Sequence, residues 1–259
     1  MIASDRAAGV RGTNPALPVR LTSLAAFLIL WEIVARLADT RVFPPASRVI
    51  ARMWSEAVSG PLPLDLVITL GRVAAAFAIA MVLGTAVGLA MGSWRKLDLL
   101  FDSWLTVLLN LPALVLIVLI YIWFGLTEAA IVFAVALNKL PTTAIIVREG
   151  ARSVDRGLVE MAESFRIGTW PRMRHVLLPQ LYPYMIAAAR SGLALIWKIV
   201  LVAEILGRGS GIGFRIQVYF QLFDVTGILA YSLAFILVVQ LIEWGALQPL
   251  DRLAARGRP

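Results

Sequence analysis

Six long apolar stretches constrain the fold of this chain more than any other feature. They cover about residues 21–39, 70–92, 100–124, 128–147, 184–206 and 227–248. A helix of about 20 apolar residues is long enough to cross the roughly 30 Å hydrocarbon core of a bilayer. The composition agrees, because 60% of the 259 residues are hydrophobic, more than a soluble domain normally contains. The sequence therefore predicts an all-α integral membrane protein with six spans.

Two short tails, residues 1–20 and 249–259, flank the predicted six-span domain of residues 21–248. The first span is predicted to be retained rather than cleaved as a signal peptide. It is long, it contains Glu32 and Arg36, and it lacks a clear small-residue cleavage site.

The basic residues between the spans predict the orientation of the chain. With both termini in the cytoplasm, fourteen of them lie on the cytoplasmic side: Arg6, Arg11, Arg20, Arg95, Lys96, Arg148, Arg152, Arg156, Arg166, Arg172, Arg174, Arg252, Arg256 and Arg258. Five lie on the opposite side: Arg41, Arg48, Arg52, Arg208 and Arg215. The positive-inside rule therefore favours cytoplasmic termini. The net charge of +8 is distributed by topology rather than gathered on one face, so no nucleic-acid binding is expected.

The cysteine and histidine counts exclude several classes of site. The chain has no cysteine, which excludes disulfides, thiolate metal sites and thiol nucleophiles. Its single histidine, His175, excludes a multi-histidine metal site. It contains no Gly-Lys pair of a phosphate-binding loop and no G-x-S-x-G or H-E-x-x-H motif. We therefore predict no catalytic residue and no metal, and an intramembrane enzyme is disfavoured.

One cytoplasmic segment, "VEMAESFRIGTWPRMRHVLLP" (159–179), carries many charges between apolar stretches. A first short amphipathic helix is predicted from one apolar stripe, formed by Leu158, Met161, Ala162 and Phe165. Asp155 or Ser153 can cap it. A second short helix is predicted to open near Pro171 and to end at Pro179 and Pro183, before the fifth span. The residues alone allow either a helix pair lying in the lipid headgroups or a docking element for a cytoplasmic protein.

This segment resembles the cytoplasmic "EAA" loop of ABC importer permeases, which reads Glu-Ala-Ala, three residues, Gly, nine residues, then Ile-x-Leu-Pro. The residues in register are Glu160, Ala162, Val176, Leu178 and Pro179, with Met161 at the family's second position. Arg166 stands where the family has glycine, and Gly168 follows two residues later. We therefore expect the turn between the two helices to move to Gly168.

Other stretches are similar, in the same order, to the nitrate/sulfonate/taurine group of these permeases: "PPASRVIARMW", "TLGRVAAAFAIAMVLGTAVGLAMG", "SVDRGLVEMAE" and "LVAEILGRGSGIGF". The resemblance implies a type I ABC importer permease in a bacterial inner membrane. Its partners would be a second permease copy (homo- or heterodimer), two cytoplasmic ATPase subunits and a periplasmic or lipid-anchored binding protein. ATP and Mg²⁺ would bind to the ATPase and no cofactor to this chain.

The resemblance also implies that segment 153–179 couples the permease to the ATPase. The coupling residues would be Asp155, Leu158, Glu160, Met161, Ala162, Phe165, Arg166, Gly168, Leu178 and Pro179. The chain would then import a small, anionic solute delivered by the binding protein. The alternative is a self-contained carrier or channel for a small anion, which would have no need of such a loop.

Polar residues within the spans are candidates for the translocation pathway: Asn110, Asn138, Lys139, Lys198 and Glu204. Lys139 and Lys198 lie near the midplane and would suit an anionic substrate. Alternatively, each pairs with an acid on a neighbouring helix, such as Asp102, Glu204 or Glu243. After the fifth span, Gly207, Gly209, Gly211 and Gly213 predict a compact periplasmic turn with positive φ.

Overall fold

The computed structural model describes residues 16–247, and every regular element in that range is a helix. The predicted C-terminal tail and residues 1–15 of the predicted N-terminal tail lie outside it. The α-helices are α1 (Ala16–Ala38), α2 (Ala46–Ser59), α3 (Leu62–Ser93), α4 (Arg95–Asn110), α5 (Ala113–Phe124), α6 (Glu128–Arg152), α7 (Arg156–Ser164), α8 (Thr169–Arg172), α9 (Leu178–Gly207), α10 (Ile212–Gln221) and α11 (Val225–Ile242). Two π-helical turns are η1 (Met173–Leu177) and η2 (Glu243–Leu247).

Four helical segments in the described part of the chain are long and apolar enough to cross a membrane: Leu62–Ser93, Glu128–Arg152, Thr169–Gly207 and Val225–Gly245. The pair α4 and α5 could provide a fifth span. Helix α1 covers the first predicted span but is not among these segments, so the structure does not establish the predicted count of six. The fold class is nevertheless that of an all-α, multi-pass membrane protein.

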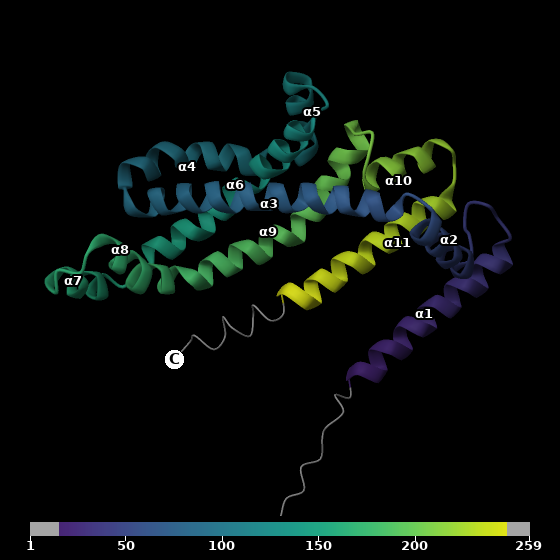
Figure 1. The fold of residues 1–259 in the computed structure, drawn as a ribbon, viewed down its shortest axis with the longest axis horizontal. Helices are drawn as coiled ribbons and strands as arrows, with labels where there is room; N and C mark the ends of the chain where they lie inside the picture. The colour runs from purple at the N-terminus through teal and green to yellow at the C-terminus, as the bar shows by residue number, and fades with distance from the viewer. Residues whose placement is uncertain (1–15, 248–259) are drawn as a thin grey trace, which may run out of the picture.

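Small residues let helices α3 and α6 pack closely along the middle of the molecule (Figure 1). A Cβ at Gly84 would lie 2.7 Å from the Thr143 side chain, and one at Gly88 would lie 2.5 Å from the carbonyl oxygen of Ala144. Glycines four residues apart on one helix allow this close backbone approach. Helix α9 packs on both α3 and α6, and buried Ile131, Val135, Ile196, Val200 and Tyr231 share the resulting core.

The third predicted span, residues 100–124, is not one straight helix. It begins earlier, at Arg95, and α4 and α5 are bent by 100° at Leu111 and Pro112. Leu111 is extended, with φ −71° and ψ 124°, as expected for a residue before proline. The bend lies directly before Pro112, whose ring disfavours a helical conformation of Leu111.

The second short helix of the charged segment does not stop before the fifth span, contrary to the sequence-based expectation. Helix α8, turn η1 and helix α9 form a continuous helical segment from Thr169 to Gly207. In η1 the chain widens to a π-helical turn, where the N–H of Leu178 donates to the carbonyl of Met173. Pro179 follows this π-helical turn directly, and the helix continues through it although proline has no N–H to donate. Proline therefore does not end the helix here.

Candidate functional site

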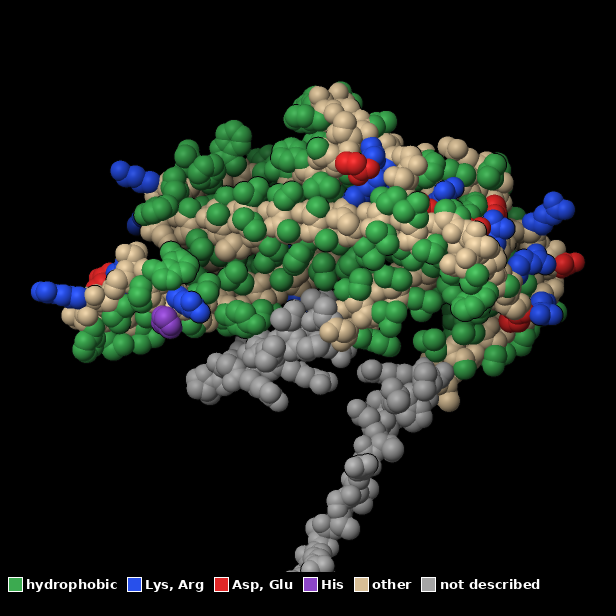
Figure 2. Space-filling model, in the orientation of Figure 1, with side chains coloured by type: hydrophobic (Ala, Val, Ile, Leu, Met, Phe, Trp, Pro, Cys, Tyr) green, Lys and Arg blue, Asp and Glu red, His purple; other side chains and the backbone are tan. Residues whose placement is uncertain are grey.

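In Figure 2, charged side chains lie near both ends of the molecule and in one group near the middle of its upper edge, whereas hydrophobic side chains cover most of the face. By the predicted orientation, the end where α3 begins and α9 ends is the outer end. The opposite end carries α7 and α8 (Figure 1). Each end contains a group of residues that the structure organises, and we describe the outer one first.

A buried polar cluster joins α3, α6 and α9 to the glycine turn at the outer end. We call it the outer cluster: Asp65, Thr69, Arg72, Glu128, Glu204, Arg208 and Arg215. Its centre is the Arg72 side chain, which is 4% exposed, and the Glu204 side chain, which is fully buried. Their closest atoms, Arg72 Nη1 and Glu204 Oε1, are 2.6 Å apart.

The hydrogen bonds of Arg72 account for all five of its side-chain N–H donors. Nε and Nη2 donate to the two oxygens of Glu128 at 2.8 and 2.7 Å. Nη1 donates to Glu204 and to the carbonyl of Ser210, and Nη2 also donates to the Ser210 hydroxyl. Because a guanidinium carries five such donors, Arg72 has no unmet donor. A buried charge needs this degree of pairing to be tolerated.

Three successive backbone N–H groups of the glycine turn bind to the same cluster. Asp65 accepts from Gly211 at 3.1 Å, the Thr69 hydroxyl accepts from Ile212 at 2.9 Å, and Glu204 accepts from Gly213 at 2.8 Å. Gly211 has φ +100°, and a Cβ there would lie 2.5 Å from Glu204 Oε1. The expected positive-φ turn is present, and it occurs at this glycine. The cluster thus fixes the start of α10.

Two further arginines complete the outer cluster. Arg208 donates to Glu128 and to the carbonyl of Leu126. Arg215 Nε donates to Asp65 at 2.8 Å. Burial disfavours the charged form of Arg215, but its hydrogen bond to Asp65 and the charge of that carboxylate outweigh this and raise its pKa. Three acids and three arginines therefore balance one another.

The two lysines near the midplane do not pair with Glu204 or Asp102, one of the sequence-based alternatives. Glu204 binds Arg72, and Asp102 binds Arg148 at 2.5 Å. Lys139 is 2% exposed and lies between α6 and α9, where its Nζ is 3.4 Å from the Ser191 hydroxyl. Lys198, in contrast, is exposed on α9. The structure therefore separates two lysines that the sequence suggested as joint contacts of an anionic substrate.

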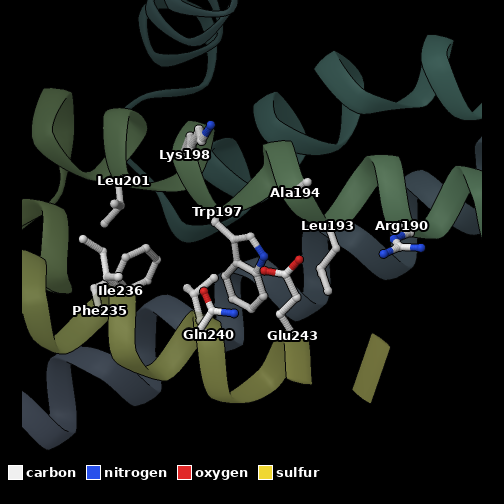
Figure 3. Close-up of a pocket in the computed structure, with 11 residues that line it drawn as sticks. Arg190, Leu193, Ala194, Trp197, Lys198, Leu201, Phe235, Ile236, Gln240 and Glu243 are labelled. Atoms are coloured by element: carbon white, nitrogen blue, oxygen red, sulfur yellow. The ribbon is translucent and has the colours of Figure 1, made fainter. Parts of the chain in front are cut away.

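A cavity of about 460 Å³ lies between α9 and α11 (Figure 3). The residues that line it include Arg190, Trp197, Lys198, Phe235, Gln240 and Glu243. Trp197 and Phe235 form an edge-to-face pair with ring centroids 6.3 Å apart. In Figure 3 the amine of Lys198 points away from Trp197 and Glu243. Asn110 lies elsewhere, at the end of α4, where its side chain donates to the carbonyl of Thr106.

At the other end, the loop of residues 153–179 presents an exposed apolar surface. Asp155 caps α7, since its carboxylate accepts from the N–H of Gly157 at 2.8 Å. Ala162 is buried, but Phe165 is 75% exposed, and Met161, Trp170 and Met173 are exposed too. Glu160 is also exposed on α7. Of the apolar stripe predicted from the sequence, Leu158, Met161 and Phe165 are therefore exposed within the described residues, whereas Ala162 is buried.

Hydrogen bonds fix this loop to the base of the bundle. Ser153 Oγ donates to the Tyr184 hydroxyl at 2.8 Å, and the N–H of Asp155 donates to Gln180 at 2.8 Å. Glu163 pairs with Arg172 across the loop at 2.5 Å, not with Arg166 as helical spacing would allow. Leu158 and Met161 face Val176 and Pro179 across a cavity of about 280 Å³. Motion of α7 would therefore be transmitted to the start of α9.

The turn after α7 occurs at Arg166 and not at Gly168, which corrects the sequence-based expectation. Arg166 has φ +53°, whereas Gly168 has φ −57°. The N–H of Ile167 donates to the carbonyl of Ala162, and the N–H of Arg166 donates to that of Glu163, both at 2.9 Å. These two bonds define a Schellman motif, in which the left-handed residue is usually glycine. The left-handed residue thus lies at the position where the EAA loop has its glycine, although the residue here is arginine.

Replacing Arg166 by glycine is expected to stabilise this loop by about 0.5–1 kcal/mol. A left-handed conformation costs an L-residue about 1–2 kcal/mol, and the greater freedom of glycine in the unfolded chain offsets part of the gain. Hydrogen–deuterium exchange over residues 156–177 should slow in Arg166→Gly. Ser164→Gly, a control within α7, should speed it. Faster exchange in Arg166→Gly would contradict the strained backbone.

A second ion-pair group holds helix α4 to the end of α6. Arg148 binds Asp102 at 2.5 Å and Asp98 at 3.3 Å, and Arg152 also binds Asp98. Sequence reasoning missed this group and most of the outer cluster. One signal was available for the latter: Asp65, Thr69 and Arg72 are spaced to form a polar stripe on an otherwise apolar helix.

Comparisons with known proteins agree with this architecture. Residues 80–244 match the family described as "Binding-protein-dependent transport system inner membrane component". An aliphatic sulfonates transport permease protein of Escherichia coli (strain K12) is 33% identical over 89% of this chain and 88% of its own length. The taurine transport system permease protein of the same organism is 26% identical over 89% and 86%.

A solved structure of the MetNI methionine ABC transporter in an inward-facing conformation superposes with a TM-score of 0.63, at 19% identity. The match covers 76% of this chain and 97% of that chain and supports the fold. The chain therefore belongs to the family of binding-protein-dependent transport system inner membrane components, in its nitrate/sulfonate/taurine group, as a multi-pass ABC importer permease subunit and not an enzyme.

Proposed function

We propose that this chain imports a small anionic solute, of the sulfonate or taurine kind, across the inner membrane. The exposed apolar loop at residues 153–179 carries the proposal, because a self-contained carrier has no use for such a surface. Two copies of a permease would form the pathway, with both termini in the cytoplasm. A binding protein would deliver the solute from outside, and two ATPase subunits would bind inside.

The ATPase would dock on the loop that joins α6 to α9. Phe165 and Trp170 would enter an apolar groove, since large exposed aromatic side chains are the usual anchors of protein interfaces. Glu160 would contribute a charged contact from the same helix. Because η1 runs directly into α9, ATP-driven movement of α7 and α8 would displace a membrane-spanning helix. Nucleotide chemistry would remain on the ATPase, together with ATP and Mg²⁺.

One face of α9 would line the pathway. Six of the exposed residues of α9 recur every three or four positions along this face: Ala187, Arg190, Ala194, Lys198, Val202 and Leu206. Charged side chains in the membrane face a water-filled space or another protein surface rather than lipid. The stripe would thus face the second permease copy across an aqueous path. Its two cations, eight residues apart, would favour an anionic solute. Lys139 lies in the core, and we do not place it on this path.

Reconstitution tests the proposal directly. The permease, with its ATPase subunits, would be placed in proteoliposomes with taurine or ethanesulfonate and the external binding protein. Uptake that requires both ATP and the binding protein is expected. Uptake that proceeds without ATP and the ATPase would instead identify a self-contained carrier.

Replacing Lys198 by glutamate is expected to lower the uptake of a sulfonate at least tenfold. The substitution puts a negative charge where the anion passes, and unfavourable like-charge contacts cost several kcal/mol. Lys198→Arg should retain most uptake. Lys139→Met removes a buried cation that lies off the path and should leave the substrate concentration for half-maximal uptake unchanged. Equal uptake by Lys198→Glu and the wild type would remove Lys198 from the pathway.

A further inference from the structure

We propose that the turn between α10 and α11, together with the adjacent face of α2, is the docking surface for the external binding protein. The central residue is Phe223, which would enter an apolar hollow on that partner. This proposal rests on the proposed function, since it assumes that a binding protein delivers the solute. It adds the place of contact and its chemistry.

Three apolar side chains project from the turn at the outer end. Phe220 and Leu222 are 67% and 68% exposed, and Phe223 is 88% exposed, more than any other large hydrophobic side chain in the described part of the chain. We call these three residues the outer knob. Asp224 caps the following helix, because its carboxylate accepts from the N–H of Gly227 at 3.0 Å. The knob therefore stands at the point where the chain turns to enter the membrane.

The backbone of the outer knob is strained yet well ordered by hydrogen bonds. Phe223 has φ +56°. The N–H of Asp224 donates to the carbonyl of Tyr219 at 2.9 Å, and the N–H of Phe223 donates to that of Phe220 at 3.1 Å. This is again a Schellman motif, with a bulky aromatic residue where glycine is favoured. Left-handed φ is rare for such residues.

Strain of this kind is retained where the side chain itself is needed. Glycine at position 223 would form the same turn without a steric penalty, so the phenyl ring serves some purpose other than folding. A rigid turn also holds the ring in one place before a partner arrives, which reduces the entropy lost on binding. A lipid headgroup region needs no such fixed placement, because a ring at any flanking position could enter it.

The surroundings of the knob include two arginines and two acids, and one of the arginines, Arg48, has no acidic partner in the described part of the chain. A cavity of about 460 Å³ lies beside it, and the residues around it are Arg48, Ala51, Arg52, Ser55, Asp224 and Thr226. Arg52 is held by Glu56 at 3.0 Å and lies 6.0 Å from the centre of the Tyr219 ring. No ion pair of Arg48 occurs within residues 16–247. A partner that fits this surface would place a carboxylate at Arg48 next to an apolar hollow for Phe223.

Helix α2 is fixed relative to the knob, so the two parts can act as one surface. The Tyr219 and Tyr231 hydroxyls lie 3.4 and 3.3 Å from the two carboxylate oxygens of Glu56. Val49 of α2 is fully buried. The apolar side chains therefore come from the turn between α10 and α11, and the arginines come from α2. These three helices do not move independently.

The test uses Phe223→Gly in the complete permease–ATPase complex, reconstituted in proteoliposomes with the purified binding protein. Glycine suits the left-handed position, so the variant should unfold at or above the wild-type temperature. We expect the binding-protein concentration for half-maximal ATP hydrolysis to rise at least tenfold. Phe223→Tyr, which keeps the ring, should stay within twofold of the wild type. Arg48→Glu should raise the same concentration at least fivefold.

The outcomes separate this proposal from the proposed function. If the wild-type complex does not respond to the binding protein at all, the proposed function fails. If the wild type responds and Phe223→Gly responds equally, only the docking surface is wrong. A photoreactive benzoylphenylalanine at position 223 adds a second arm: cross-links to the binding protein support the proposal. Cross-links only to lipid or to the second permease copy overturn it.

Discussion

Replacing Glu204 by alanine is expected to lower the free energy of unfolding by about 3–5 kcal/mol. The substitution leaves Arg72 buried without its closest counter-charge, and removing one partner of a buried ion pair costs this much. It also removes the acceptor for the N–H of Gly213 and for the Thr69 hydroxyl. Equilibrium unfolding in mixed detergent micelles would measure the loss. The glycine turn should become accessible to proteolysis in the variant.

Glu128→Ala is the matched control. Glu128 makes two hydrogen bonds to Arg72, but its side chain is 57% exposed, so water can replace the lost carboxylate. We expect a loss of about 1 kcal/mol, typical of an exposed pair. If Glu204→Ala and Glu128→Ala destabilise the protein equally, burial does not set the strength of the outer cluster. If Glu204→Ala leaves the stability unchanged, the cluster does not brace the outer end.

The membrane class of the fold could be predicted because hydropathy is a local property of the sequence. A window of about 20 apolar residues carries the signal by itself. The outer cluster could not be predicted in the same way, since Arg72 and Glu204 lie 132 residues apart. Their contact depends on how α3 and α9 pack. The same limit explains why the sequence left open a pairing of the lysines with Asp102 or Glu204, which bind Arg148 and Arg72 in the structure.

The loop of residues 153–179 shows a different limit, which concerns backbone conformation rather than packing. Residue type suggested a turn at Gly168, because glycine adopts positive φ most easily. The hydrogen bonds that close α7 instead require the left-handed residue directly after its last turn, and Arg166 occupies that position. The end of α7 therefore determines which residue takes the left-handed conformation. The protein tolerates the conformational cost of a non-glycine residue there. Phe223 occupies the equivalent position after α10.

Replacing Phe165 by aspartate is expected to abolish ATP-dependent uptake while the permease still folds. The side chain is 75% exposed in the described chain, so its replacement removes little packing within the subunit. In the docked complex, a carboxylate would have to enter an apolar groove. Loss of a central aromatic anchor weakens an interface by about 2–4 kcal/mol. The affinity for the ATPase should therefore fall about 30- to 1,000-fold. Co-purification and titration with the ATPase would measure it.

Controls on the same helix separate docking from folding. Phe165→Leu keeps an apolar side chain and should retain most of the affinity. Glu160→Lys reverses a charge on the docking face, and we expect it to weaken ATPase binding more than Glu160→Gln does. The glutamine variant only loses an attractive contact, whereas the lysine variant also introduces a repulsive one. All four variants should match the wild type in unfolding, because both positions are exposed. Normal assembly and uptake in both Phe165→Asp and Glu160→Lys would mean that this loop is not where the ATPase binds. The loop would then be better explained as a helix pair that lies in the lipid headgroups, which the sequence also allows. In that case, cross-links from position 165 would form with lipid rather than with the ATPase.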